Sequence, residues 1–110
     1  MGLTISNREL SNGWVSITVE GEVDLATVNE LQSAIDAVLE NGGHHLVVDL
    51  TASSFMDSTG LKALVMSHRT FDEVGRSFAI AIDSGPVSRL IDLSGVDQTI
   101  RTVRSVEELD

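Results

Sequence analysis

Hydrophobic residues recur along this chain with two different periods, and the change from one to the other marks where a strand gives way to a helix. Residues 46–50 are almost wholly apolar, which is typical of a strand buried on both faces. From Leu61 onward the apolar residues recur three or four positions apart, which is typical of a helix with one buried face. We therefore predict a central strand at residues 46–50 and a helix that begins near Ser58 and ends at residues 74–75.

The same two patterns alternate through the rest of the chain. A strand-like run ends at Asn12-Gly13, a dipeptide typical of hairpins, and apolar and polar residues then alternate as in a half-buried strand. Thr27 and Glu30 form a capping-box pattern at the start of a helix, and Ser105 and Glu108 form a second one near the C-terminus. The remaining predicted elements are strands at residues 78–82 and 99–103 and a helix over residues 86–93. The order predicts one α/β domain, residues 1–110, with a mixed sheet of about five strands covered by about four helices.

Between the central strand and its helix lie three consecutive residues that can cap a helix: Asp57, Ser58 and Thr59. One cap is enough, so at least one hydroxyl should remain free, and Gly60 places no side chain over the backbone behind it. Open α/β sheets bind their ligands where strands end and helices begin. The pattern predicts a functional hydroxyl here, with an ordinary helix cap as the alternative.

Three motifs in one order carry a family resemblance. They are residues 21–27 (GEVDLAT), residues 57–61 (DSTGL) and residues 84–90 (SGPVSRL). With them the chain resembles the anti-sigma factor antagonists, the stand-alone members of the STAS domain family, over nearly its whole length. One departure is Ser53, which stands where an apolar residue is expected before the second motif.

The resemblance implies a STAS-like fold and a switch that depends on phosphorylation of Ser58. The unmodified protein would bind an anti-sigma factor that is itself a serine kinase and so release a sigma factor, and a separate serine phosphatase would reset the switch. Asp57 would hold the helix start, and Asp24 would lie near Ser58 and orient it or contact the kinase. The partner-binding residues that the resemblance implies are Asp24, Asp57, Ser58, Thr59, Gly60 and Leu61. It implies a binding protein that is not an enzyme and uses no cofactor.

Composition narrows the classes of partner. The net charge of -10, from 17 acidic and 7 basic residues in 110, would repel a phosphate backbone, so we expect no direct contact with nucleic acid and a partner with a basic face. The chain contains no cysteine, which removes disulfides, thiolate metal sites and thiol switches. No apolar run approaches the roughly 18 residues that a membrane span needs. We expect a free-standing cytoplasmic protein that makes no contact with a membrane.

The sequence lacks the residues that catalysis or metal binding would need. A hydrolase elbow requires Gly-x-Ser-x-Gly, and Met56 occupies the place of the first glycine. His68 would lie about 15 Å from Ser58 along the same helix. His44 and His45 should lie at the opposite end of the central strand, and as adjacent residues they point apart. We predict neither a catalytic centre nor a metal site.

Three further alternative functions remain, and two of them depend on residues other than Ser58. Asp83-Ser84-Gly85 matches the motif of homodimeric aspartic proteases, but those proteins are nearly all strand. A receiver-like domain modified on Asp49 is the stronger alternative, although such domains need a late lysine and the only lysine here is Lys62. A nucleotide-binding STAS module is the third, because a helix start such as that at Ser58 can hold an anion.

Overall fold

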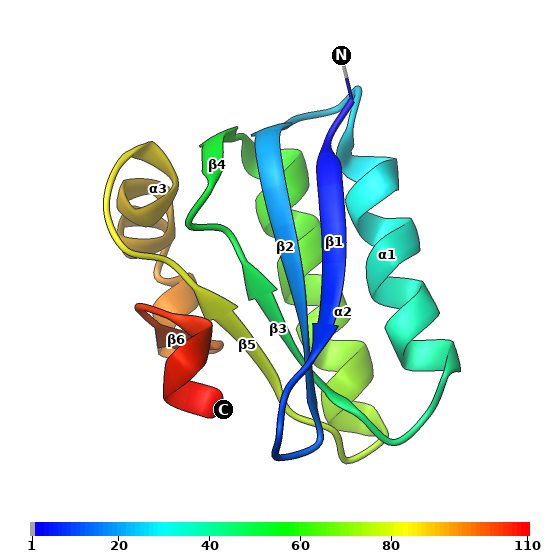
Figure 1. The fold of residues 1–110 in the computed structure, drawn as a ribbon. Coiled ribbons are helices and arrows are strands. Elements are labelled where there is room, and N and C mark those ends of the chain that lie inside the picture. The colour runs from blue at the N-terminus through cyan, green and yellow to red at the C-terminus, as the bar shows by residue number, and fades with distance from the viewer. Residues whose placement is uncertain (1) are drawn as a thin grey trace.

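Strand β2 (Trp14–Val23) organises the sheet, because three other strands pair with it in the structure, a computed structural model that describes residues 2–110 (Figure 1). Strand β1 (Thr4–Glu9) is antiparallel to β2. Strands β3 (His45–Asp49) and β4 (Ser53–Met56) are both parallel to it, β3 along its first half and β4 along its end. Strands β5 (Phe78–Ala81) and β6 (Arg101–Val103) continue the sheet in parallel, which gives the order β1-β2-β3-β5-β6.

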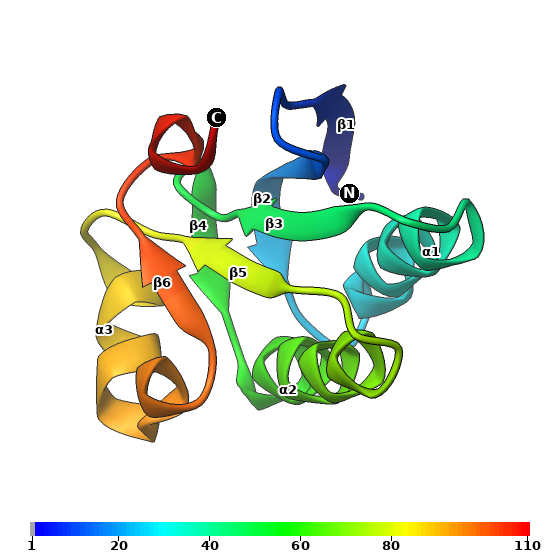
Figure 2. The same cartoon turned by 90° about the horizontal axis from the view of Figure 1, so that it is seen from below.

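The two faces of the sheet are covered differently (Figure 2). Helices α1 (Val28–Glu40), α2 (Ser58–Glu73) and α3 (Pro86–Ser94) lie on one face and enclose the main core. The opposite face carries a smaller cluster beneath the 3-10 helix η2 (Val106–Leu109), whose Val106 and Leu109 pack with Trp14. Alternation along each strand explains the division, since Ile17 faces the main core and Trp14 faces the smaller one. Among the described residues, no helix is long and apolar enough to cross a membrane.

The structure confirms the α/β class and corrects both counts. The sheet has six strands, because β4 also forms a strand that the sequence analysis did not predict. Ser53, the residue expected to be apolar, opens this strand and donates a hydrogen bond from its hydroxyl to the Val19 carbonyl at 3.0 Å. Residues 2–110 contain three α-helices rather than four, since the terminal segment is the 3-10 helix η2 and a second 3-10 helix, η1 (Val96–Gln98), follows α3.

Of the two predicted capping boxes, only the C-terminal one forms. The Ser105 hydroxyl accepts from the Glu107 N–H at 3.2 Å, and the Glu108 carboxylate accepts from the Ser105 N–H at 3.1 Å. At the start of α1 the prediction was wrong, because Thr27 makes no side-chain cap. Its hydroxyl donates to the Glu22 carbonyl at 2.7 Å instead.

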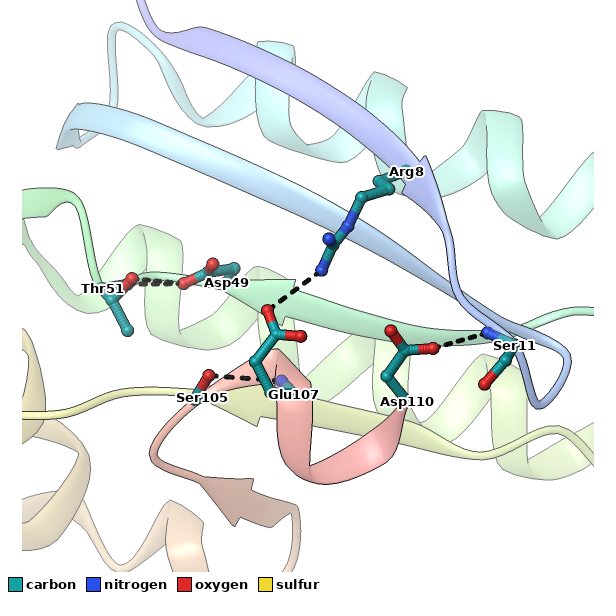
Figure 3. A network of polar contacts seen from close by, with 7 residues as sticks. All are labelled: Arg8, Ser11, Asp49, Thr51, Ser105, Glu107 and Asp110. Carbon is teal, nitrogen blue, oxygen red and sulfur yellow. Dashed lines mark hydrogen bonds and ion pairs between the residues drawn. The ribbon is translucent and has the colours of Figure 1, made fainter.

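Polar contacts tie η2 and the C-terminal residue to the β1–β2 hairpin (Figure 3). Arg8 pairs with Glu107 at 3.3 Å, and the Ser11 N–H donates to the Asp110 carboxylate at 2.7 Å. The bond from Ser11 holds the pKa of that carboxyl below its usual range. The Arg8–Glu107 pair is largely exposed and contributes little by itself, so the apolar cluster beneath η2 holds this segment in place.

Arg76, which the sequence analysis did not single out, joins the end of α1 to His44, the residue before β3. Its guanidinium donates to the carbonyl oxygens of Val38 and Leu39, at 3.0 and 2.9 Å, and to that of His44. It also lies 4.8 Å from the centre of the Phe71 ring. Arg76 thereby gives the Val38 carbonyl a donor at the end of α1 and adds a second donor to the Leu39 carbonyl, which also accepts from the Gly42 N–H at 3.3 Å.

Candidate functional site

The candidate site lies at the carboxyl ends of the parallel strands. We call this end of the sheet the edge that carries Ser58. Val23, the last residue of β2, pairs with Met56, the last residue of β4, and the Asp57 N–H donates to the Val23 carbonyl at 3.1 Å. The loop that follows β2 and the start of α2 therefore leave the sheet side by side, at the upper edge of Figure 1. His45 begins β3 at the other edge, as the sequence analysis expected.

Asp57 fixes where α2 begins. Its backbone is extended and its carboxylate accepts from the N–H groups of Thr59 and Gly60, at 2.9 and 3.4 Å. The same oxygen accepts from the Thr59 hydroxyl. That hydroxyl bond is the largest of the effects that hold the pKa of Asp57 below its usual range, the two N–H bonds act in the same direction, and partial burial opposes them. The cap is therefore a carboxylate at neutral pH.

Ser58 is left as the free hydroxyl that the sequence analysis predicted. It is the first residue of α2, its side chain is exposed, and its hydroxyl has no hydrogen-bond partner among residues 2–110. Thr59 differs, because its hydroxyl is bound to Asp57 and its side chain is partly buried. Of the two neighbouring hydroxyls, only that of Ser58 is available to a partner.

Gly60 lets α2 lie close against the sheet. A Cβ atom at this position would stand 2.8 Å from Met56 Cγ and 2.8 Å from Val23 Cγ1, and both of these side chains are buried in the main core. Contacts this short are not tolerated, so a side chain would push the start of the helix outward. Gly60 is therefore one determinant of where Ser58 stands.

Asp24 lies at the same edge but uses its carboxylate within its own turn. That carboxylate accepts from the N–H groups of Ala26 and Thr27, at 3.0 and 3.2 Å, and lies 3.3 Å from the Thr27 hydroxyl, whose one proton makes the shorter bond to the Glu22 carbonyl. No hydrogen bond joins Asp24 to Ser58 in the described part of the chain. Asp24 therefore follows the residue that is bonded to Asp57, and the hydrogen bonds of its carboxylate stay within its own turn.

Leu61, the last of the predicted partner-binding residues, is half-buried and packs against the main core. The most exposed apolar side chains at this edge are instead Leu25, at 76 %, and Phe55, at 42 %. The sequence analysis missed both. Phe55 belongs to the unpredicted strand β4, in which buried Met56 points the other way, and Leu25 lies in a turn, where apolar periodicity carries no information.

The residues on which the alternative functions would depend are less favourably placed for them than Ser58 is for modification. The carboxylate of Asp49 accepts from the Thr51 N–H and hydroxyl, at 3.0 and 2.6 Å, as Figure 3 shows. His45 Nδ1 accepts from the Ser77 N–H at 2.9 Å, so it has no lone pair free at that atom. Within residues 2–110 no group of three or more histidine, aspartate or glutamate side chains is placed to hold a metal ion.

Comparison with known proteins gives one consistent family. The model of the STAS domain matches residues 7–109. The chain is 33 % identical over 99 residues to the anti-sigma-F factor antagonist RsfB of Mycobacterium tuberculosis, which covers 88 % of this chain and 79 % of RsfB. The structure is similar to that of an anti-sigma factor antagonist from Mycobacterium paratuberculosis, with a TM-score of 0.85, 27 % identity, and coverage of 96 % of this chain and 89 % of that one.

A third similarity concerns the fold alone. The structure of SpoIIAA, a cell fate determinant of Bacillus, in its phosphorylated form matches with a TM-score of 0.72 and 19 % identity, over 97 % of both chains.

Proposed function

Since the chain belongs to the STAS domain family, we propose that it is an anti-sigma factor antagonist whose binding is switched by phosphorylation of Ser58. The observation that carries the proposal is the state of Ser58, which is exposed, unpartnered within residues 2–110 and held at the start of α2. RsfB is named as an antagonist of an anti-sigma factor, and SpoIIAA is described in a phosphorylated form. Both descriptions support the same role here.

In the proposed cycle the unmodified protein binds an anti-sigma factor, and the sigma factor that this partner had held is released. The anti-sigma factor is also a serine kinase. It transfers the γ-phosphoryl group of ATP to the Ser58 oxygen. The bond from Oγ to phosphorus forms, the bond from phosphorus to the β,γ-bridging oxygen breaks, ADP leaves, and the hydroxyl proton passes to a base of the kinase. A separate serine phosphatase hydrolyses the phosphoserine and restores binding. Because its partners act on transcription, the proposal places the protein in the cytoplasm.

The phosphate acts through its charge. Asp57 already occupies the N–H groups of Thr59 and Gly60, so the phosphate stands beside the carboxylate cap rather than replacing it. It brings about 1.5 to 2 negative charges to a position next to an ionised carboxylate. Any carboxylate of the kinase that approaches this edge is then repelled, and the complex separates.

The test is phosphorylation by a cognate kinase. The purified protein is incubated with ATP and, in turn, with each serine kinase of the anti-sigma type that the same genome encodes. We expect one phosphate per chain, located on Ser58 by mass spectrometry and stable in hydroxylamine. Ser58→Ala should accept no phosphate and still bind the kinase, whereas Ser54→Ala, a matched change at an exposed serine of β4, should be phosphorylated normally.

Two outcomes would contradict the proposal. A phosphate lost in hydroxylamine would be an acyl phosphate and would favour the receiver-like alternative at Asp49. Phosphate that remains on Ser58→Ala would place the modification on another hydroxyl, such as Thr59 or Ser54.

A further inference from the structure

We propose that Leu25, together with Phe55, is the apolar anchor that the anti-sigma factor kinase buries when it binds the edge that carries Ser58. The inference rests on the proposed function and adds the residues that determine affinity for the kinase. Leu25 is 76 % exposed, in the turn that follows β2, and Phe55 is 42 % exposed on β4. Single exposed leucines are common on protein surfaces, so the case depends on how this one is held and on what surrounds it.

The turn that carries Leu25 is closed by many hydrogen bonds. The N–H groups of Thr27 and Val28 both donate to the Asp24 carbonyl, at 3.1 and 2.8 Å. The Asp24 N–H donates to the Thr27 hydroxyl at 3.0 Å, and the Asp24 carboxylate accepts from the Ala26 N–H at 3.0 Å. A side chain on such a turn loses little backbone freedom on binding, and this preorganisation favours affinity.

The charged groups beside Ser58 have other tasks. The Asp24 carboxylate closes the turn and the Asp57 carboxylate caps α2. Neither can turn to a partner without giving up bonds within the domain. Each carboxylate accepts these bonds through Oδ1, which leaves its Oδ2 to meet a basic group of the partner. Leu25, Phe55 and the Ser58 hydroxyl are exposed and take no part in these bonds, so a partner can engage them without disrupting the fold.

Leu25 lies within reach of a partner that acts on Ser58. Val23 and Met56 are paired on strands about 4.8 Å apart, and Leu25 and Ser58 each follow two residues later, a span of at most about 7 Å. Their Cα atoms are therefore no more than about 19 Å apart. A standard interface covers about 800 Å² of each partner, a patch about 30 Å across, so one kinase can cover both residues.

These surroundings define the chemistry of the partner's surface. A pocket for the Leu25 side chain should be bordered by basic groups on the side that faces Glu22 and Asp24, because the chain has a net charge of -10. The kinase surface over Ser58 should instead carry the carboxylate that a phosphate on Ser58 repels. Leu64, also on α2, cannot take part, since it is wholly buried in the main core.

The experiment compares Leu25→Ala with Val74→Ala in binding to the kinase that phosphorylates Ser58 in the parent protein. Val74 is a matched control because it is also apolar and 58 % exposed. It lies at the far end of α2, 16 residues after Ser58 and about 24 Å from it along the helix. We expect Leu25→Ala to weaken binding by about 10- to 100-fold, as for a central anchor residue, and Phe55→Ala to weaken it in the same direction. Val74→Ala should bind within about twofold of the parent.

Thermal unfolding of each variant identifies a loss that comes from misfolding, and Leu25→Ala should melt with the parent because its side chain is largely exposed. Parent-like affinity for Leu25→Ala would overturn the inference and leave the proposed function intact. An equal loss in Val74→Ala would also overturn it. If no kinase modifies Ser58 in the parent, the proposed function itself fails.

Discussion

Gly60→Ala should destabilise the domain, although alanine is the better helix former. In an unhindered helix this change would stabilise by up to about 1 kcal/mol. Here the new Cβ would stand 2.8 Å from Met56 Cγ and Val23 Cγ1. Met56 is flexible, but Val23 is β-branched and wholly buried, so it cannot turn away. Overpacking of this kind costs about 1–3 kcal/mol, which leaves a net loss of up to about 2 kcal/mol.

A double-mutant cycle with Val23→Ala isolates the contact. Removing the Val23 methyl groups leaves room for the new Cβ, so Gly60→Ala should cost about 1 kcal/mol less in the Val23→Ala background than in the parent. Urea unfolding measures all four proteins. For a domain of this size each kcal/mol also corresponds to a shift of several degrees in Tm.

The result that would refute this reasoning is stabilisation by Gly60→Ala, by the same amount in both backgrounds. It would mean that α2 does not lie close against β2 and β4 at its first turn. If the reasoning holds, the variant should also be phosphorylated more slowly while still folded, because the start of α2 carries Ser58 and a displacement of about 1 Å can cost about a hundredfold in rate.

Three other predictions test the switch, the cap and the sheet. Ser58→Asp should weaken binding to the kinase by about a hundredfold or more in calorimetry and melt within a few degrees of the parent, and full affinity would contradict a switch based on charge. The pKa of Asp57 is lowered in the folded protein, so its contribution is present above the unfolded pKa, near about 4, and is lost as the pH falls through the folded value. The difference in stability between the parent and Asp57→Asn should therefore shrink below about pH 4 in urea unfolding, and a difference independent of pH would exclude an ionised cap. Backbone amides of residues 46–50 should be among the slowest to exchange, since β3 is paired on both sides, and rapid exchange there would argue against this sheet order.

Local patterns predicted the parts of the fold that depend on neighbouring residues. The apolar run of β3 and the start of α2 near Ser58 need no knowledge of distant residues, and the structure has both within one residue of the prediction. The pattern alone did not choose Asp57 over Ser58 and Thr59 as the cap. Strand β4 was missed because it is four residues long and only Met56 faces the core. Its pairing with the end of β2 is a contact between distant segments, which periodicity cannot reveal.

The capping box predicted at the start of α1 does not form, which shows within the site that a local pattern does not reveal competing partners. Thr27 and Glu30 have the right spacing, but each has a competing partner that is not apparent from that pattern. The Thr27 hydroxyl donates to the Glu22 carbonyl, and the Glu30 carboxylate accepts from the Leu3 N–H at 3.1 Å. The role of the Asp24 carboxylate within its own turn likewise became apparent only in three dimensions, and its contact with a kinase stays a prediction.

The switch proposed here needs a modification that changes binding without unfolding the protein, and the start of α2 would meet this need because helix capping and the exposed hydroxyl belong to different residues, Asp57 and Ser58. Asp57 satisfies the N–H groups of Thr59 and Gly60, so the stability of the helix start does not depend on Ser58. A phosphate at an exposed helix N-terminus changes stability by about 0.3–1 kcal/mol, a small part of the roughly 5–15 kcal/mol that holds a domain together. The same phosphate within about 6 Å of a partner's carboxylate is repelled by a few kcal/mol at an effective dielectric near about 20. In the proposed switch the effect on the complex thus exceeds the effect on the fold, and the proposed phosphatase would leave a folded domain ready to bind again.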